Sequence, residues 1–123
     1  MNEVKARTLL ARFRTAWEAR DLDATLNCFD DSGVYDASVD PGPGRRACGR
    51  SAVRILLSEM FDHDTGAVTD IQNEVLLQDG GNWLGWWTWI YALPGGRIER
   101  GCDRIVIGAE GILLKDAYRK MCS

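Results

Sequence analysis

The stretch that decides the fold is Trp83-Leu84-Gly85-Trp86-Trp87-Thr88-Trp89-Ile90-Tyr91-Ala92-Leu93, which is followed after a short break by Ile98 to Ile107. Both segments are rich in aromatic and β-branched residues, which favour strands. The Pro94-Gly95-Gly96 cluster between them is typical of a hairpin turn. We therefore expect the two segments to pair as antiparallel strands.

The register of this hairpin decides which side chains share a face of the sheet. If Gly95 and Gly96 are the two turn residues, Thr88 lies opposite Asp103, and opposed residues point to the same side. Trp86 then shares that side with both. A carboxylate at the centre of an apolar strand is either buried with a partner or lines a cavity, so this face is the candidate site.

The other face of the same strand carries Trp87, Trp89 and Tyr91 in this register, as an apolar stripe too large to leave in contact with water on a monomer. We therefore expect a homodimer through the convex face of the sheet. One alternative stays open, because a one-residue bulge in the hairpin would exchange the faces and bring Trp87 and Trp89 beside Asp103.

The rest of the chain supplies helices before this hairpin and strands around it. Apolar residues at helical spacing predict three amphipathic helices, and Asp21 and Ser51 are the expected N-caps of the second and third. Residues 39–46 are rich in Pro and Gly and predict a loop. The expected order is helix 4–19, helix 21–29, short strand 34–37, helix 51–61, then strands 68–77, 83–93, 98–107 and 112–118. This order predicts an α+β fold in a single domain over residues 1–123, with a four-stranded antiparallel meander covered by the helices.

Composition and charge exclude several classes of function. The formal net charge is -3, so the positive field that attracts proteins to nucleic acid is missing and we expect no nucleic-acid partner. No apolar tract is long enough to span a membrane and the first residues lack a secretion signal, which favours the cytoplasm. With His63 as the single histidine and no CxxC pair, we expect no metal site and no cofactor.

Five short motifs, in this order and at these spacings, resemble the nuclear transport factor 2-like superfamily, which includes SnoaL-like polyketide cyclases, ketosteroid isomerase and limonene epoxide hydrolase. They are Ala19-Arg20-Asp21-Leu22-Asp23, Cys28-Phe29-Asp30-Asp31, Cys48-Gly49-Arg50-Ser51-Ala52-Val53, Arg100-Gly101-Cys102-Asp103-Arg104-Ile105 and Glu110-Gly111-Ile112. The resemblance covers essentially the whole chain. It implies a cone-shaped curved mixed sheet, with the short first strand beside the meander and three N-terminal helices over its concave face.

The resemblance also implies a site in the mouth of the cone. Asp103 matches an acid that hydrogen-bonds an oxyanion in the isomerase, and Tyr35 matches a water-positioning tyrosine of the epoxide hydrolase. Phe13 stands at the isomerase's oxyanion tyrosine and Ala37 at its general base, unless the loop brings Asp40 into that role. The matched catalytic sets are therefore incomplete.

Two functions remain open from the sequence. The first is an enzyme without metal or cofactor that acts by proton transfer on a small apolar cyclic or carbonyl-bearing molecule, as an isomerase, cyclase, dehydratase or hydrolase. In it Asp103 and Tyr35 are the catalytic residues. The expected substrate-binding residues are Phe13, Trp17, Asp40, Trp86, Thr88 and Ile105. The second is a non-catalytic ligand-binding or dimerisation module in which Asp103 is a structurally satisfied buried acid.

Overall fold

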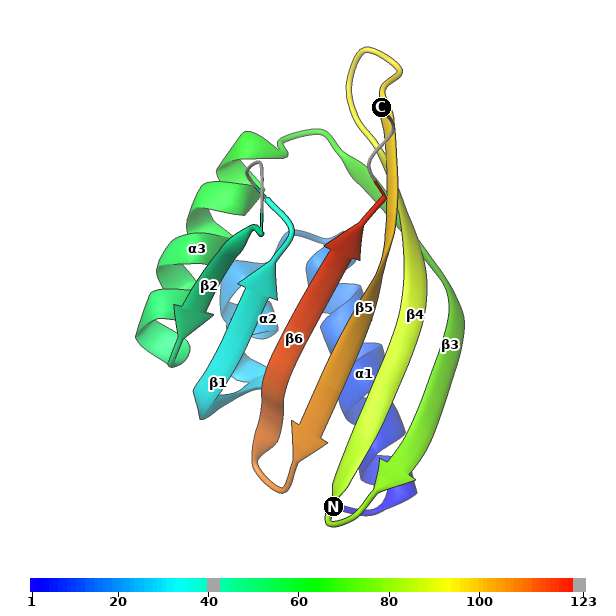
Figure 1. The fold of residues 1–123 in the computed structure, drawn as a ribbon. Coiled ribbons are helices and arrows are strands. Elements are labelled where there is room, and N and C mark those ends of the chain that lie inside the picture. Colours follow the sequence, from blue (N-terminus) through cyan, green and yellow to red (C-terminus); the bar gives the residue numbers. More distant parts are fainter. Residues whose placement is uncertain (40–42, 121–123) are drawn as a thin grey trace.

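The computed structural model describes residues 1–39 and 43–120, and in them three helices pack against one mixed sheet of six strands (Figure 1). The elements are α1 (Glu3–Glu18), α2 (Leu22–Asn27), β1 (Phe29–Ala37), β2 (Arg45–Cys48), α3 (Arg50–His63), β3 (Val68–Asp79), β4 (Asn82–Ala92), β5 (Ile98–Gly108) and β6 (Gly111–Arg119). Strands lie side by side in the order β2, β1, β6, β5, β4, β3. The predicted α+β class with a curved mixed sheet and a covering helical layer is confirmed.

The helices begin where local signals place them, with one exception. Asn2 caps α1, and the Asp21 side chain accepts a hydrogen bond from the Ala24 amide as the expected cap of α2. The expected Ser51 cap of α3 is wrong, because the helix already starts at Arg50. Gly49 precedes it with φ +88°, a conformation that glycine adopts without strain, and this bend leads the chain from β2 into the helix.

One strand was missed from the sequence. β2 lies at the end of the segment expected to be a loop, and it pairs antiparallel with β1, with Tyr35 opposite Ala47. Its composition carries no strand signal, so the pairing with β1 decides its conformation. β1 is also longer than expected, because Phe29 already pairs with Ile112 across an irregularity that ends at Val34.

The hairpin of β4 and β5 has a three-residue loop instead of the expected two-residue turn. The amide of Leu93 donates to the carbonyl of Arg97 at 2.8 Å, which leaves Pro94, Gly95 and Gly96 as the loop. Both glycines have positive φ, +90° and +88°, which only glycine adopts readily. The extra residue moves the register by one, so Trp87 faces Asp103 and Thr88 faces Cys102.

This shift exchanges the two faces of β4, because side chains alternate along a strand. Trp87 and Trp89 now point toward the helices and are buried, and Trp86 and Thr88 point away from them. The predicted register is therefore wrong, and the alternative with exchanged faces is the one the fold adopts.

The apolar core lies between the helices and the inner face of the sheet. α1 packs against β3 and β4, and α3 packs against β1 and β2. In the part of the chain that the structure describes, no helix is both long and apolar enough to cross a membrane.

Candidate functional site

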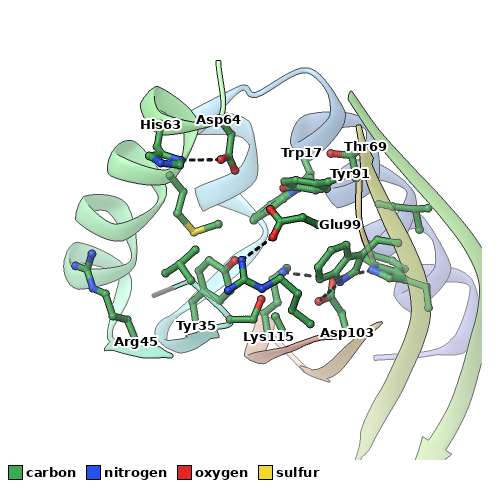
Figure 2. A pocket seen from close by; sticks show the side chains of 18 of the residues that line it. Trp17, Tyr35, Arg45, His63, Asp64, Thr69, Tyr91, Glu99, Asp103 and Lys115 are labelled. Atoms are coloured by element: carbon green, nitrogen blue, oxygen red, sulfur yellow. Dashed lines mark hydrogen bonds and ion pairs between the residues drawn. The ribbon is translucent and has the colours of Figure 1, made fainter. Parts of the chain in front are cut away.

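A cavity of about 370 Å³ opens between the inner face of the sheet and helices α1 and α3. Its walls are largely aromatic, and its charged groups are carboxylates, arginines and one lysine. Figure 2 shows many of these side chains directed toward a common space. The lining residues include Phe13, Trp17, Tyr35, Met60, Asp64, Thr69, Trp87, Trp89, Tyr91, Glu99, Asp103, Lys115 and Arg119.

Asp103 lies on the wall of this cavity and is held by two indoles. Trp87 Nε1 donates to its Oδ2 at 2.8 Å, and Trp89 Nε1 donates to its Oδ1 at 3.1 Å. Each carboxylate oxygen therefore has its own indole donor. The three-residue hairpin loop produces this arrangement, since it places both tryptophans on the same face as the acid.

Lys115 comes from β6 and forms an ion pair with Asp103, with Nζ 3.4 Å from Oδ2. Both side chains are almost fully buried, with 3% and 5% of their surface exposed. The pairing of β6 with β5 places Lys115 beside Ile105, one pleat away from Asp103. A buried pair of this kind is stable only when further contacts satisfy the charges, and here the two indoles and two aromatic rings do so.

The ammonium of Lys115 sits in an aromatic cage. Its Nζ lies 4.3 Å from the centre of the Trp17 ring and 4.5 Å from that of Tyr35, distances at which a cation is attracted to a ring face. Burial nevertheless lowers the pKa of Lys115 from its usual value, and the nearby Asp103 opposes that change only in part. The cavity therefore holds an amine whose charged form is disfavoured by desolvation.

Tyr35 is the second donor beside this amine. It lies next to Lys115 in the parallel pairing of β1 with β6 and is fully buried. Burial, with Tyr91 and Asp103 close by, raises the pKa of its hydroxyl well above the usual range, so the phenol keeps its proton at neutral pH.

A second ion pair lies in the cavity and was not found from the sequence. Arg119 Nη1 bonds Glu99 Oε2 at 2.8 Å, and Arg97 approaches the other oxygen of Glu99 at 3.4 Å. Figure 2 shows the Glu99 carboxylate directed into the cavity, on the side where Tyr35 and Lys115 lie. The alternation of side chains along β5 and β6 could have found both residues from the sequence. Glu99 shares a face of β5 with Asp103, and Lys115 shares a face of β6 with Ala117.

The predicted site residues separate into four groups. Asp103, Tyr35, Phe13 and Trp17 all line the cavity, as expected. Ile105 points inward but is part of the buried core and is not among the lining residues. Asp40 lies outside the described residues.

Trp86 and Thr88 do not line the cavity, and their predicted substrate-binding role is corrected. They lie on the outer face of the sheet, where Trp86 is 38% exposed. Thr88 Oγ1 accepts a hydrogen bond from Asn73 Nδ2 at 2.8 Å and donates one to the carbonyl of Gln72. The one-residue register shift is the cause.

The prediction that Trp87, Trp89 and Tyr91 form an exposed stripe on the convex face is wrong for the same reason. Trp87, Trp89 and Tyr91 are on the inner face, and Tyr91 accepts a hydrogen bond from Trp17 Nε1 at 2.9 Å. The outer face of the sheet nevertheless carries exposed apolar side chains beside its polar ones. Its exposed large side chains are Val75, Leu77, Trp86 and Tyr118.

No group of three or more His, Cys, Asp or Glu side chains that could hold a metal ion occurs within residues 1–39 and 43–120. The cavity offers an apolar volume in which the amine of Lys115 lies beside the protonated phenol of Tyr35. The carboxylates of Asp103 and Glu99 line the same cavity. This set can bind a carbonyl oxygen and exchange protons with the carbon next to the carbonyl group.

Comparison with known proteins agrees with this geometry. The family model described as SnoaL-like domain matches residues 10–113. No curated protein matches the chain. Solved structures do match, at low sequence identity, so they show the fold alone.

Two of these structures match closely in shape. An NTF2-like protein of unknown function from Mesorhizobium loti superposes with a TM-score of 0.79 at 21% identity, over 94% of this chain and 90% of that one. A putative polyketide cyclase from Xanthomonas campestris pv. campestris gives 0.70 at 17% identity, over 98% and 93%.

Proposed function

The chain belongs to the SnoaL-like domain family of the NTF2-like superfamily, and from this premise we propose that it is an enzyme that needs no cofactor and catalyses proton transfer on a small apolar carbonyl compound. The reaction class is enolisation, as used by isomerases and cyclases. The observation that carries the proposal is the buried Lys115–Asp103 pair on the wall of an aromatic cavity of about 370 Å³. Polyketide cyclase-like proteins among the structural neighbours support the same class. The proposed compartment is the cytoplasm.

Lys115 and Tyr35 are the proposed oxyanion donors. When a proton leaves the carbon beside a carbonyl group, negative charge develops on the carbonyl oxygen. A buried cation and a protonated phenol stabilise that charge far more than water does, because the surrounding medium is apolar and the donors are already oriented. The aromatic walls exclude water and bind the apolar body of the substrate.

Asp103 orients the amine in this proposal. Its two oxygens accept hydrogen bonds from Trp87 and Trp89, so the carboxylate is held rigidly against Lys115. It can also take the lysine proton when the substrate leaves. Asp103 therefore acts on the reaction through Lys115.

Glu99 is the proposed proton acceptor. It lines the cavity together with Asp103, and its carboxylate is directed into the space that the substrate would fill. Arg119 and Arg97 hold it in place through their ion pairs, and a carboxylate positioned in this way can accept a proton.

Hydrogen–deuterium exchange of cyclohexanone in D₂O tests this function without knowledge of the natural substrate. Wild-type protein is expected to accelerate loss of the protons beside the carbonyl, as measured by NMR. Lys115→Met and Glu99→Gln should each lower the acceleration by about a hundredfold, the lower end of what a positioned acid or base contributes. An acceleration that both variants retain would contradict the proposal.

Tyrosine variants provide a matched control. Tyr35→Phe removes the donor in the cavity and should slow the exchange, whereas Tyr118→Phe removes the same hydroxyl from the exposed outer face. Equal effects of the two variants would show that the phenol of Tyr35 has no special role.

A non-catalytic binding module is the second candidate, and one observation favours it. Both oxygens of Asp103 already have donors, so the acid is structurally satisfied. This candidate predicts that cyclohexanone raises the melting temperature of the protein but that its protons exchange no faster than in buffer.

A further inference from the structure

We propose that Lys115 is a covalent amine catalyst that forms an imine with aldehydes and ketones bound in the cavity. This inference rests on the proposed carbonyl-bearing ligand and deepens it by assigning a covalent intermediate. The amine lines the cavity, is 3% exposed and belongs to a side chain fixed by three neighbours. A ligand that fills the cavity meets its Nζ directly.

The surroundings of Lys115 are those that make an amine nucleophilic. A lysine attacks carbonyl carbon only when it is unprotonated, and desolvation in an apolar pocket favours that form. The pKa of Lys115 is lowered by its burial. The carboxylate of Asp103, 3.4 Å from Nζ, is the nearest group that can take the proton.

The steps balance without any added cofactor. Lys115 passes one proton to Asp103, and its lone pair forms a C–N bond to the carbonyl carbon as the C–O π bond breaks. A second proton passes from the nitrogen to the oxygen, which gives a neutral carbinolamine. The C–O bond of this carbinolamine then breaks with the proton that Asp103 returns, and water leaves. In sum, the ammonium and the carbonyl compound form a protonated imine and one water, and hydrolysis reverses the sequence.

The protonated imine would make the proposed proton transfer easier. Its positive nitrogen accepts the electron pair left behind when Glu99 removes a proton from the neighbouring carbon. Tyr35, next to Lys115 across the β1–β6 pairing, is placed to hydrogen-bond the substrate oxygen during these proton transfers. The same four side chains therefore serve binding, dehydration and proton removal.

The chain contains its own controls for a labelling experiment. Its lysines are Lys5, Lys115 and Lys120, and the first and last are exposed. Neither exposed lysine lies in an apolar cavity of the kind that activates an amine for attack on a carbonyl. Selective reaction of Lys115 would therefore report the environment of the cavity.

The experiment uses benzaldehyde, an apolar aldehyde without protons beside the carbonyl, so that its imine accumulates. Wild-type protein is incubated with benzaldehyde and sodium cyanoborohydride at neutral pH, and peptide mass mapping locates the benzylamine formed. We expect Lys115 to be labelled faster than Lys5 or Lys120, because a lowered pKa raises the fraction of free amine at neutral pH. Lys115→Arg, which keeps the cation but has no nucleophilic amine, should lose the fast label.

Each outcome decides between the two proposals. Equal labelling of the three lysines overturns the imine. If Lys115 stays unlabelled while cyclohexanone still exchanges, proton transfer stands and the imine falls. If Lys115 is labelled but no exchange occurs, the imine stands and the proposed proton transfer falls. Benzyl alcohol, which fits the same space but cannot form an imine, should slow the labelling by competition, and failure to compete would place the reaction outside the cavity.

Discussion

The contribution of the Lys115–Asp103 pair to stability can be predicted from its burial. Asp103→Asn removes the charge that faces Lys115, and breaking a buried ion pair by removing one partner costs about 3–5 kcal/mol. The amide also offers one oxygen where the carboxylate offers two, so one of the indoles of Trp87 and Trp89 loses its acceptor. Lys115 can lose its proton in this variant, and this limits the cost of leaving its charge without a partner. The expected loss of stability is therefore about 3–5 kcal/mol, a large share of the roughly 5–15 kcal/mol that stabilise a domain.

A double-mutant cycle separates the pair from other effects. Lys115→Met alone leaves Asp103 without its cation, whereas the double variant leaves no uncompensated charge. The double variant should therefore be about 2–3 kcal/mol more stable than the sum of the single effects predicts. Urea unfolding, followed by tryptophan fluorescence and by circular dichroism, measures all four free energies of unfolding.

The matched control is an ion pair on the outer face. Arg104 and Asp116 approach to 3.2 Å, but the arginine side chain is 47% exposed. The corresponding cycle with Arg104→Met and Asp116→Asn should give a coupling below about 1 kcal/mol, since water screens such pairs. A coupling for Lys115 and Asp103 that is no larger than this control value would refute the reasoning from burial.

Three further predictions concern the strand packing, the pH dependence and the outer face. Gly101→Ala should destabilise the protein by about 1–3 kcal/mol in urea, because a Cβ there would lie 2.3 Å from the Trp89 ring and 2.1 Å from the backbone oxygen of Tyr118. Tyr35 keeps its proton in the folded protein but loses it near pH 10 in the unfolded chain. The free energy of unfolding should therefore fall as the pH rises above about 10, by up to about 1.4 kcal/mol per pH unit. Tyr35→Phe should reduce that slope. We propose that the outer face mediates a homodimer, so Trp86→Glu should lower the mass found by sedimentation to that of a monomer.

Each of these predictions has a reference measurement. Gly81→Ala should leave stability nearly unchanged, because a Cβ at Gly81 meets nothing within 4 Å. Absorbance titration of the denatured protein gives the ionisation of the unfolded tyrosines, and if Tyr35 ionises with them in the folded protein the pH prediction fails. Ile55→Glu, on the exposed surface of α3, should not change the sedimentation. A wild-type monomer at micromolar concentration would exclude the proposed dimer.

The sequence by itself determined the order of all the elements except β2. Helical spacing located the three helices, and the tryptophan-rich strand with its Pro-Gly-Gly break located the hairpin, because these signals are local. It also singled out Asp103, since a carboxylate in an apolar strand stands out without any knowledge of the fold. The family followed from the same order of elements and motifs.

Only the tertiary structure decided which side chains surround Asp103. Period-two alternation is visible in a sequence, but its phase depends on whether the loop contains two or three residues, and a single hydrogen bond between Leu93 and Arg97 settles that. This phase exchanged Trp86 for Trp87 in the cavity. Lys115 lies beside Tyr35 through the parallel pairing of β6 with β1, a contact between distant parts of the chain that no local pattern encodes.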